Sequence, residues 1–141
     1  MFDEGIERLL DYHGRRYWLT NGWSLRFRVW CVEPSEGRPH GIRYSFTLHD
    51  EMGERILGFD NKHRANRRQV TYDHRHRFRR TEELVPYDYV DADTLLTDFF
   101  KAVEVACEGE GVAVIVEFED EDDDVAGIAY EWSESDDADA D

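Results

Sequence analysis

The stretch that decides the fold is residues 17–31, YWLTNGWSLRFRVWC. From Trp23 onward its apolar and polar side chains alternate, as in a strand with one buried face. The pair Asn21-Gly22 separates this run from a shorter apolar run, and both residues tolerate the positive φ of a type I′ turn. The stretch therefore predicts a β-hairpin.

Further strands follow the hairpin. The same alternation over Ile42–Leu48 and Arg55–Phe59 predicts two of them, and residues 69–80 are expected to be extended again. Residues 60–68 have no apolar periodicity and are expected to form a loop. Together these runs predict an antiparallel β-sheet built as a hairpin and meander.

The clearest helical signal is a wide apolar stripe over Asp91–Cys107. Asp91 or Asp93 is expected to cap the start of this helix, and Gly109 to end it. A short helix is also plausible within residues 2–13. We therefore expect an α+β fold in which one main helix packs on one face of the sheet.

The last part of the chain combines apolar and acidic stretches. Residues 112–118, VAVIVEF, are β-branched on both faces and predict a largely buried strand. Residues 125–132 are a candidate last strand, and the acidic residues 133–141 are expected to be disordered. We therefore expect one domain over residues 1–132, followed by an acidic tail.

Charge is distributed unevenly along the 141 residues, whose net charge is −16. Residues 1–80 carry 16 Lys and Arg against 11 Asp and Glu, whereas residues 81–141 carry one Lys against 22 Asp and Glu. Fifteen of the 17 basic side chains are Arg. This composition favours a salt-adapted protein over one that merely has an acidic tail.

Two cysteines, Cys31 and Cys107, lie in apolar surroundings, so we expect buried, reduced thiols. No leader-like segment and no apolar run of membrane-spanning length is evident. These features predict a cytoplasmic protein that does not enter the membrane.

The chemistry is concentrated in residues 60–80, which hold eight of the 17 basic side chains and three of the six histidines. Arginine binds phosphate through two parallel hydrogen bonds and stays charged near neutrality. The segment therefore predicts contact with RNA or another polyanion. The candidate phosphate-binding residues are Lys62, Arg64, Arg67, Arg68, Arg75, Arg77, Arg79 and Arg80.

Two histidines of this segment suggest catalysis. In an extended run, His74 and His76 share one face, while Asp73, Arg75 and Arg77 share the other. Two imidazoles can act as base and acid near neutral pH, which suffices for metal-independent RNA cleavage through the 2′-hydroxyl. Asp60 or Asp73 is expected to orient an imidazole, so the candidate catalytic residues are Asp60, Asp73, His74 and His76.

Several alternatives remain open for this segment. Its arginines could pair with the acidic half of the chain, and its imidazoles could only bind phosphate. His74 and His76 with His63 or Asp60 could also bind a metal, but neighbouring guanidinium groups would repel a cation, so we expect no metal or other cofactor. Asp60-Asn61 most simply forms a turn that fixes the loop. No Gly-rich phosphate loop, Cys-x-x-Cys pair or serine nucleophile motif is present.

Residues 16–105 resemble the TumE family of toxins. The resemblance is carried by Gly53-x-Arg55-x-x-Gly58-x-Asp60-Asn61, then Asp73-His74-Arg75-His76, then Pro86-Tyr87 and the helical LLTDF of residues 95–99. It implies a toxin whose partner is a helix-turn-helix antitoxin, with Asp60, Asn61, Asp73, His74, Arg75 and His76 as the marked residues. The Arg-rich residues 64–68 and the acidic extension after Val112 depart from the family pattern.

Two hypotheses follow from the residues and the resemblance. The first is an RNA-targeting toxin, expected to be a ribonuclease with His74 and His76 as acid and base. The second is a non-enzymatic module that binds nucleic acid or the helix-turn-helix antitoxin. The sequence does not fix the oligomeric state.

Overall fold

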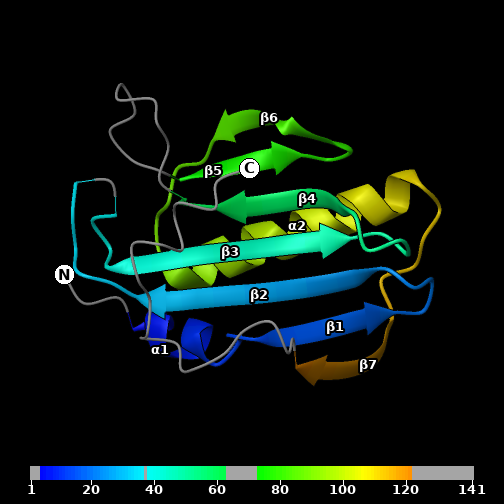
Figure 1. The fold of residues 1–141 in the computed structure, drawn as a ribbon, viewed down its shortest axis with the longest axis horizontal. Helices are drawn as coiled ribbons and strands as arrows, with labels where there is room; N and C mark the ends of the chain where they lie inside the picture. Colours follow the sequence, from blue (N-terminus) through cyan, green and yellow to red (C-terminus); the bar gives the residue numbers. More distant parts are fainter. Residues whose placement is uncertain (1–3, 37, 63–72, 122–141) are drawn as a thin grey trace.

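A computed structural model describes residues 4–36, 38–62 and 73–121. Its elements, in chain order, are α1 (Gly5–Leu10), β1 (Arg15–Leu19), β2 (Ser24–Cys31), β3 (Ile42–His49), β4 (Arg55–Asp60), β5 (His74–Arg77), β6 (Arg80–Pro86), α2 (Ala92–Gly109) and β7 (Val116–Glu121). The strands form one antiparallel sheet in the order β6-β5-β4-β3-β2-β1-β7 (Figure 1). The α+β class is confirmed. Among the described residues, no helix is both long and apolar enough to cross a lipid bilayer.

Helix α2 lies across one face of the sheet and builds the core there (Figure 1). Leu95, Phe99 and Val103 are fully buried and repeat at the four-residue spacing that keeps them on one side of the helix. The ring of Phe99 contacts Phe27 and Phe46 from neighbouring strands. The predicted main helix is confirmed. The opposite face of the sheet carries no helix among the described residues, and we call it the helix-free face; the polar side chains of β2 and β3 lie there.

The ends of α2 agree with the sequence only in part. Asp91 caps the start, because its Oδ1 atom accepts a 2.7 Å hydrogen bond from the backbone N–H of Thr94. The helix ends with Gly109, as expected, although Gly111 rather than Gly109 takes the left-handed conformation. The short helix expected within residues 2–13 is confirmed, because α1 spans Gly5–Leu10.

The hairpin of β1 and β2 is confirmed, but its turn is not type I′. The backbone pairs Leu19 with Trp23, which leaves a three-residue loop. Of the loop residues only Gly22 has positive φ, at 91°, whereas Asn21 does not. Asn21 instead accepts a hydrogen bond from the backbone N–H of Trp23 through its side chain. A three-residue loop needs only one left-handed position, and glycine supplies it.

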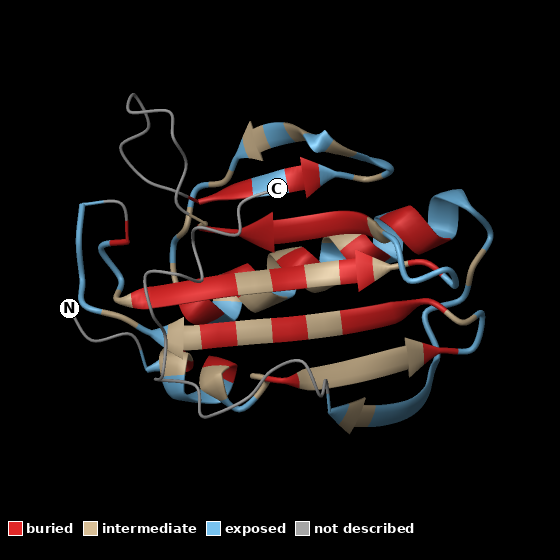
Figure 2. Cartoon of the chain, viewed as in Figure 1, coloured by how far each residue is buried: buried red, intermediate tan, exposed pale blue. Residues whose placement is uncertain are grey.

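Two expectations for strands are corrected. Residues 74–86 form a hairpin rather than one extended run, because Arg79, with φ of 57°, turns the chain between β5 and β6. The strand expected at residues 112–118 begins at Val116 and is an exposed edge strand (Figure 2). It pairs with β1 and carries acidic residues that need water, so its apolar residues lie outside the core.

The expectations for the cysteines are confirmed only in part, and those for the C-terminal residues are not tested. Cys107 is buried as expected, but Cys31 is exposed at the end of β2, and both thiols are free. Residues 125–132 and 133–141, like most of the expected 60–68 loop, lie outside the described residues. The extent of the domain and the state of its tail remain predictions.

Asn61 joins two strands in the interior, because its backbone follows β4 and its side chain closes β3. Its Oδ1 atom accepts from the backbone N–H of Tyr44, and its Nδ2 donates to the carbonyl of Ile42, at 2.9 and 2.8 Å. The side chain is buried, so water cannot replace these bonds. The predicted structural role of Asn61 extends from a turn to the pairing of β4 with β3, two interior strands of the sheet.

Replacing Asn61 with Ala is expected to lower the free energy of unfolding by about 2–4 kcal/mol, because a buried donor and a buried acceptor lose their partners. Urea denaturation measures the change. Met52→Ala, at an exposed turn, is the control and should alter the free energy by less than about 0.5 kcal/mol. A loss as small as that of the control would show that these two hydrogen bonds do not stabilise the fold.

Candidate functional site

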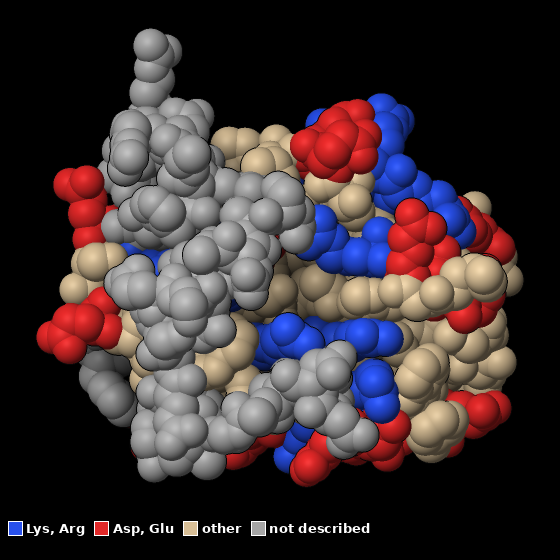
Figure 3. All heavy atoms as spheres, in the orientation of Figure 1, with Lys and Arg blue, Asp and Glu red and all other residues tan. Residues whose placement is uncertain are grey.

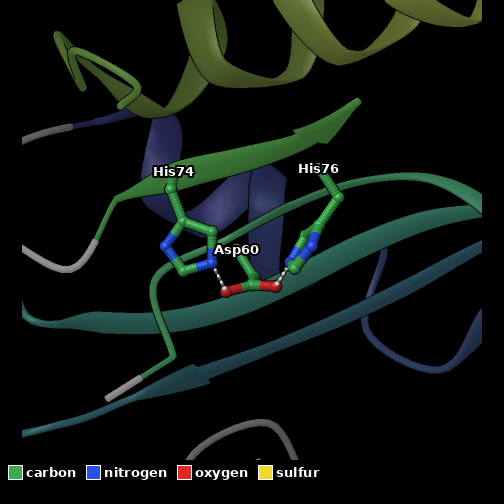
Figure 4. Close-up of side chains that lie close together, drawn as sticks. All are labelled: Asp60, His74 and His76. Atoms are coloured by element: carbon green, nitrogen blue, oxygen red, sulfur yellow. Dashed lines mark hydrogen bonds and ion pairs between the residues drawn. The ribbon is translucent and has the colours of Figure 1, made fainter. Parts of the chain in front are cut away.

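The candidate site is formed where β4 and β5 pair. Asp60 is the last residue of β4, and His74 begins β5 directly opposite it. His76 lies opposite Gly58, one pleat further along. Because alternate residues of a strand share a face, all three side chains lie on the helix-free face and point toward one another (Figure 4). This Asp60–His74–His76 cluster confirms that the two histidines share a face.

Asp60 contacts both imidazoles. Its Oδ1 atom lies 2.8 Å from Nε2 of His74, and its Oδ2 atom lies 2.9 Å from Nε2 of His76. Oδ1 also accepts a hydrogen bond from the backbone N–H of Lys62, which is the expected Asx turn. Turn formation and imidazole orientation were alternatives in the sequence, and one carboxylate does both.

The cluster is buried, yet Asp60 stays ionised. Burial by itself raises the pKa of this carboxyl, but the hydrogen bonds and charges of His74 and His76 outweigh that effect and hold the pKa well below its usual range. Asp60 therefore presents an ionised carboxylate to both Nε2 atoms.

His76 is held at both of its ring nitrogens. Its Nδ1 atom lies 2.6 Å from the carbonyl oxygen of Thr81, and because a carbonyl only accepts, Nδ1 must donate. A neutral imidazole then has a lone pair on Nε2, which faces the carboxylate of Asp60. That contact is attractive only when a positive group, a proton or a metal ion, lies between the two atoms.

Basic side chains share the helix-free face with the cluster. Strand pairing aligns Arg28, Ser45, Asp60 and His74 in one row across the sheet, and Arg26, Thr47, Gly58 and His76 in the next. With strands spaced by about 4.8 Å, Arg28 starts roughly 10 Å from Asp60. Figure 3 shows basic side chains over the middle strands of this face.

His49 reports the charge on this face. Its Nδ1 donates to the carbonyl of Gly53, and its Nε2 accepts from the hydroxyl of Thr47, so the ring is neutral. Burial, with the nearby guanidinium groups of Arg26, Arg55 and Arg28, lowers the pKa of His49 to about 4, although the bond to Gly53 opposes this. Three arginines are thus close enough to raise the local positive potential.

The basic residues predicted on β5 and β6 lie elsewhere. Arg75 and Arg77 project from the opposite face of β5 and line a cavity beneath α2. Arg79 forms an ion pair with Glu110 at 2.6 Å, and Arg77 and Arg80 lie 3.7 and 3.5 Å from Glu83. Strand alternation turns Arg75 and Arg77 away from the imidazoles, although His76 also lines this cavity.

Asp73 is also separate from the cluster. It lies on the helix face, where its Oδ2 atom accepts a 2.7 Å hydrogen bond from the hydroxyl of Tyr44. Burial raises the pKa of this carboxyl, and the bond from Tyr44 opposes the rise. Asp73 therefore supports the core and does not touch either imidazole ring nitrogen through a described contact. Lys62 lies beside Asp60, while Arg64, Arg67, Arg68 and His63 are outside the described residues.

Arg26, Arg28 and Arg55 were not predicted from the sequence as site residues, because they are far from the histidines along the chain. The signal was present in the polar positions of the run LRFRV, residues 25–29. Their relation to the cluster becomes evident only from the strand register, which places β2 two strands from β4.

Fold and site together define a small α+β protein with a buried carboxylate–imidazole cluster beside basic side chains. The family model described as Toxin TumE matches residues 14–106, which include every residue of the cluster. The chain belongs to the TumE family of toxins, and as a toxin of a toxin–antitoxin system it has an antitoxin partner. No curated protein and no solved structure matches the chain significantly.

Replacing Arg26 with Gln is expected to raise the pKa of His49 from about 4 toward its ordinary 6.5, because one repelling charge is removed. NMR titration of the imidazole signals measures it. Arg75→Gln removes a charge from the other face and should leave this pKa unchanged. An unaltered pKa of His49 in the Arg26 variant would mean that Arg26 does not contribute, which would leave burial, Arg55 and Arg28 as the causes of the lowered pKa.

Proposed function

We propose that this toxin cleaves RNA on the helix-free face of its sheet, with the Asp60–His74–His76 cluster as the reactive centre. The observation that carries the proposal is the shared face: aligned rows hold Arg26 and Arg28, on β2, on the same face as the carboxylate and imidazoles, with only β3 between β2 and the strand of Asp60. Helix α2 lies on the other face of the sheet and does not cover either row, so an extended polyanion could lie along the rows.

The arginines of this face are suited to phosphate. The Nε–H of Arg26 is buried and meets no acceptor within the described part of the chain. A phosphate oxygen would supply that acceptor, and a guanidinium group can bind it in a bidentate manner. The neutral state of His49 leaves the binding charge to the arginines, so phosphate affinity should change little near neutral pH.

The cluster is suited to proton transfer or phosphate activation because it concentrates a carboxylate and two imidazoles. Ser45 and Thr47, the neighbours of Asp60 and Gly58 on β3, are short and half-buried, and they separate the cluster from Arg28 and Arg26 in the two rows. In the resting arrangement both Nε2 atoms contact Asp60, so an imidazole can exchange a proton with RNA only after its contact opens.

The second candidate function is a binding module without catalysis, as the sequence also allowed. It is favoured by the burial of both imidazoles, which lie at 0% and 3% side-chain exposure. In either case we propose that the antitoxin is a helix-turn-helix protein that covers the helix-free face.

Variants on the two faces test where RNA binds. Arg26→Gln combined with Arg28→Gln should weaken binding and lower the slope of log affinity against log salt by roughly 1.4, since each single-strand phosphate contact contributes about 0.7. Arg75→Gln combined with Arg77→Gln is the matched control, with the same charge change beneath α2. Fluorescence anisotropy with labelled RNA at several salt concentrations measures both.

The cleavage arm uses His74→Ala and total RNA. Loss of cleavage with RNA affinity retained supports a ribonuclease, whereas a wild type that binds RNA without cleaving it supports the binding module. If the control pair weakens binding and the Arg26/Arg28 pair does not, the helix-free face is not the RNA-binding surface.

A further inference from the structure

The Asp60–His74–His76 cluster also has the composition of a metal site. Each residue offers one ligand atom, and the three atoms lie within 4.8 Å of one another. Two imidazole nitrogens with one carboxylate oxygen suit divalent transition metals. We propose that the cluster binds one such ion, with Zn²⁺ as the natural occupant by ligand chemistry.

The hydrogen bond from His76 to Thr81 is the strongest support. Histidines that bind a metal usually donate their other ring N–H to a carbonyl or carboxylate, which fixes the tautomer and aims the lone pair at the ion. Nδ1 of His76 donates to the Thr81 carbonyl at 2.6 Å, and Nε2 faces Asp60. The tautomer required for metal binding is therefore set by the backbone.

The site needs little rearrangement to admit the ion. The Nε2–carboxylate distances of 2.8 and 2.9 Å are those of hydrogen bonds. Ligands bound to Zn²⁺ at about 2.1 Å lie roughly 3.3 Å apart in a tetrahedral site, so each contact would open by about 0.5 Å.

The electrostatic objection raised by the sequence weakens in the structure. Arg75 and Arg77 flank the histidines along the chain, yet they project beneath α2, on the other side of the sheet. On the helix-free face, Arg28 lies two strands from Asp60 in its row, and Arg26 lies three strands from His76 in the next row. Asp60 contributes the negative charge that offsets part of the charge of a cation.

The inference goes beyond the proposed function, and it stands on geometry alone although it concerns the same residues. An ion at the cluster would act as a Lewis acid for a phosphate oxygen or water. His74 and His76 would then hold the ion rather than exchange protons with RNA.

Metal binding is tested on the full-length protein after removal of bound ions with a chelator. We expect titration with Co²⁺ to give one equivalent of binding and visible d–d absorption, and Zn²⁺ to displace it. Asp60→Asn and His74→Gln should each lower the affinity at least 10-fold. His49→Gln, a histidine of the same face outside the cluster, should bind as the wild type does.

A second measurement uses the wild type alone and needs no variant. In long-range proton–nitrogen NMR spectra, Zn²⁺ is expected to shift the Nε2 signals of His74 and His76, while Nδ1 of His76 keeps its proton. Absence of stoichiometric binding by the folded wild type, or equal binding by the cluster variants, would overturn the proposal and leave a proton between His76 and Asp60. No RNA enters these measurements, so their result is independent of the cleavage test.

Discussion

One buried carboxylate organises the centre of this molecule. Asp60 connects β4 to β5 through two imidazoles, and its neighbour Asn61 connects β4 to β3 through hydrogen bonds between its side-chain amide and the backbone of β3. Burying a charged carboxylate costs free energy unless its oxygens have hydrogen-bond partners. His74 and His76 occupy positions that supply these partners to Asp60. Two adjacent residues thus hold three strands in register.

Local patterns in the sequence were sufficient for much of the fold. Alternation over residues 23–31 and 42–48 identified β2 and β3, and the apolar stripe of residues 91–107 identified α2, because each pattern matches the period of its element. The errors fell where local preference and burial disagree. Residues 112–118 have strand-like side chains, which predicted a buried strand. Burial of β7 would also have removed its acidic residues from water, and the free-energy cost of that desolvation is not visible in the periodicity.

The candidate site was half accessible to sequence reasoning. Alternation correctly placed His74 and His76 on one face and Arg75 and Arg77 on the other. It could not say which face α2 would cover, so proximity along the chain was taken for proximity in space. Arg26 and Arg28 join the site through pairing across three strands, which is a long-range property of the sheet. The link from His76 to Thr81 depends on the β5–β6 turn and is equally non-local.

The composition of β7 affects how molecules meet one another. As the last strand of the sheet, β7 presents a backbone edge of the kind that recruits strands from other copies. Val116 and Phe118 are exposed on it, which would favour such stacking into aggregates. Four of its six residues are acidic, however, so a second β7 brought alongside would place carboxylates against carboxylates. Because Glu119 and Asp120 are held in ion pairs with Arg15 and Arg16, this repulsion would come from Glu117 and Glu121, and it would oppose stacking of copies through the apolar residues of β7.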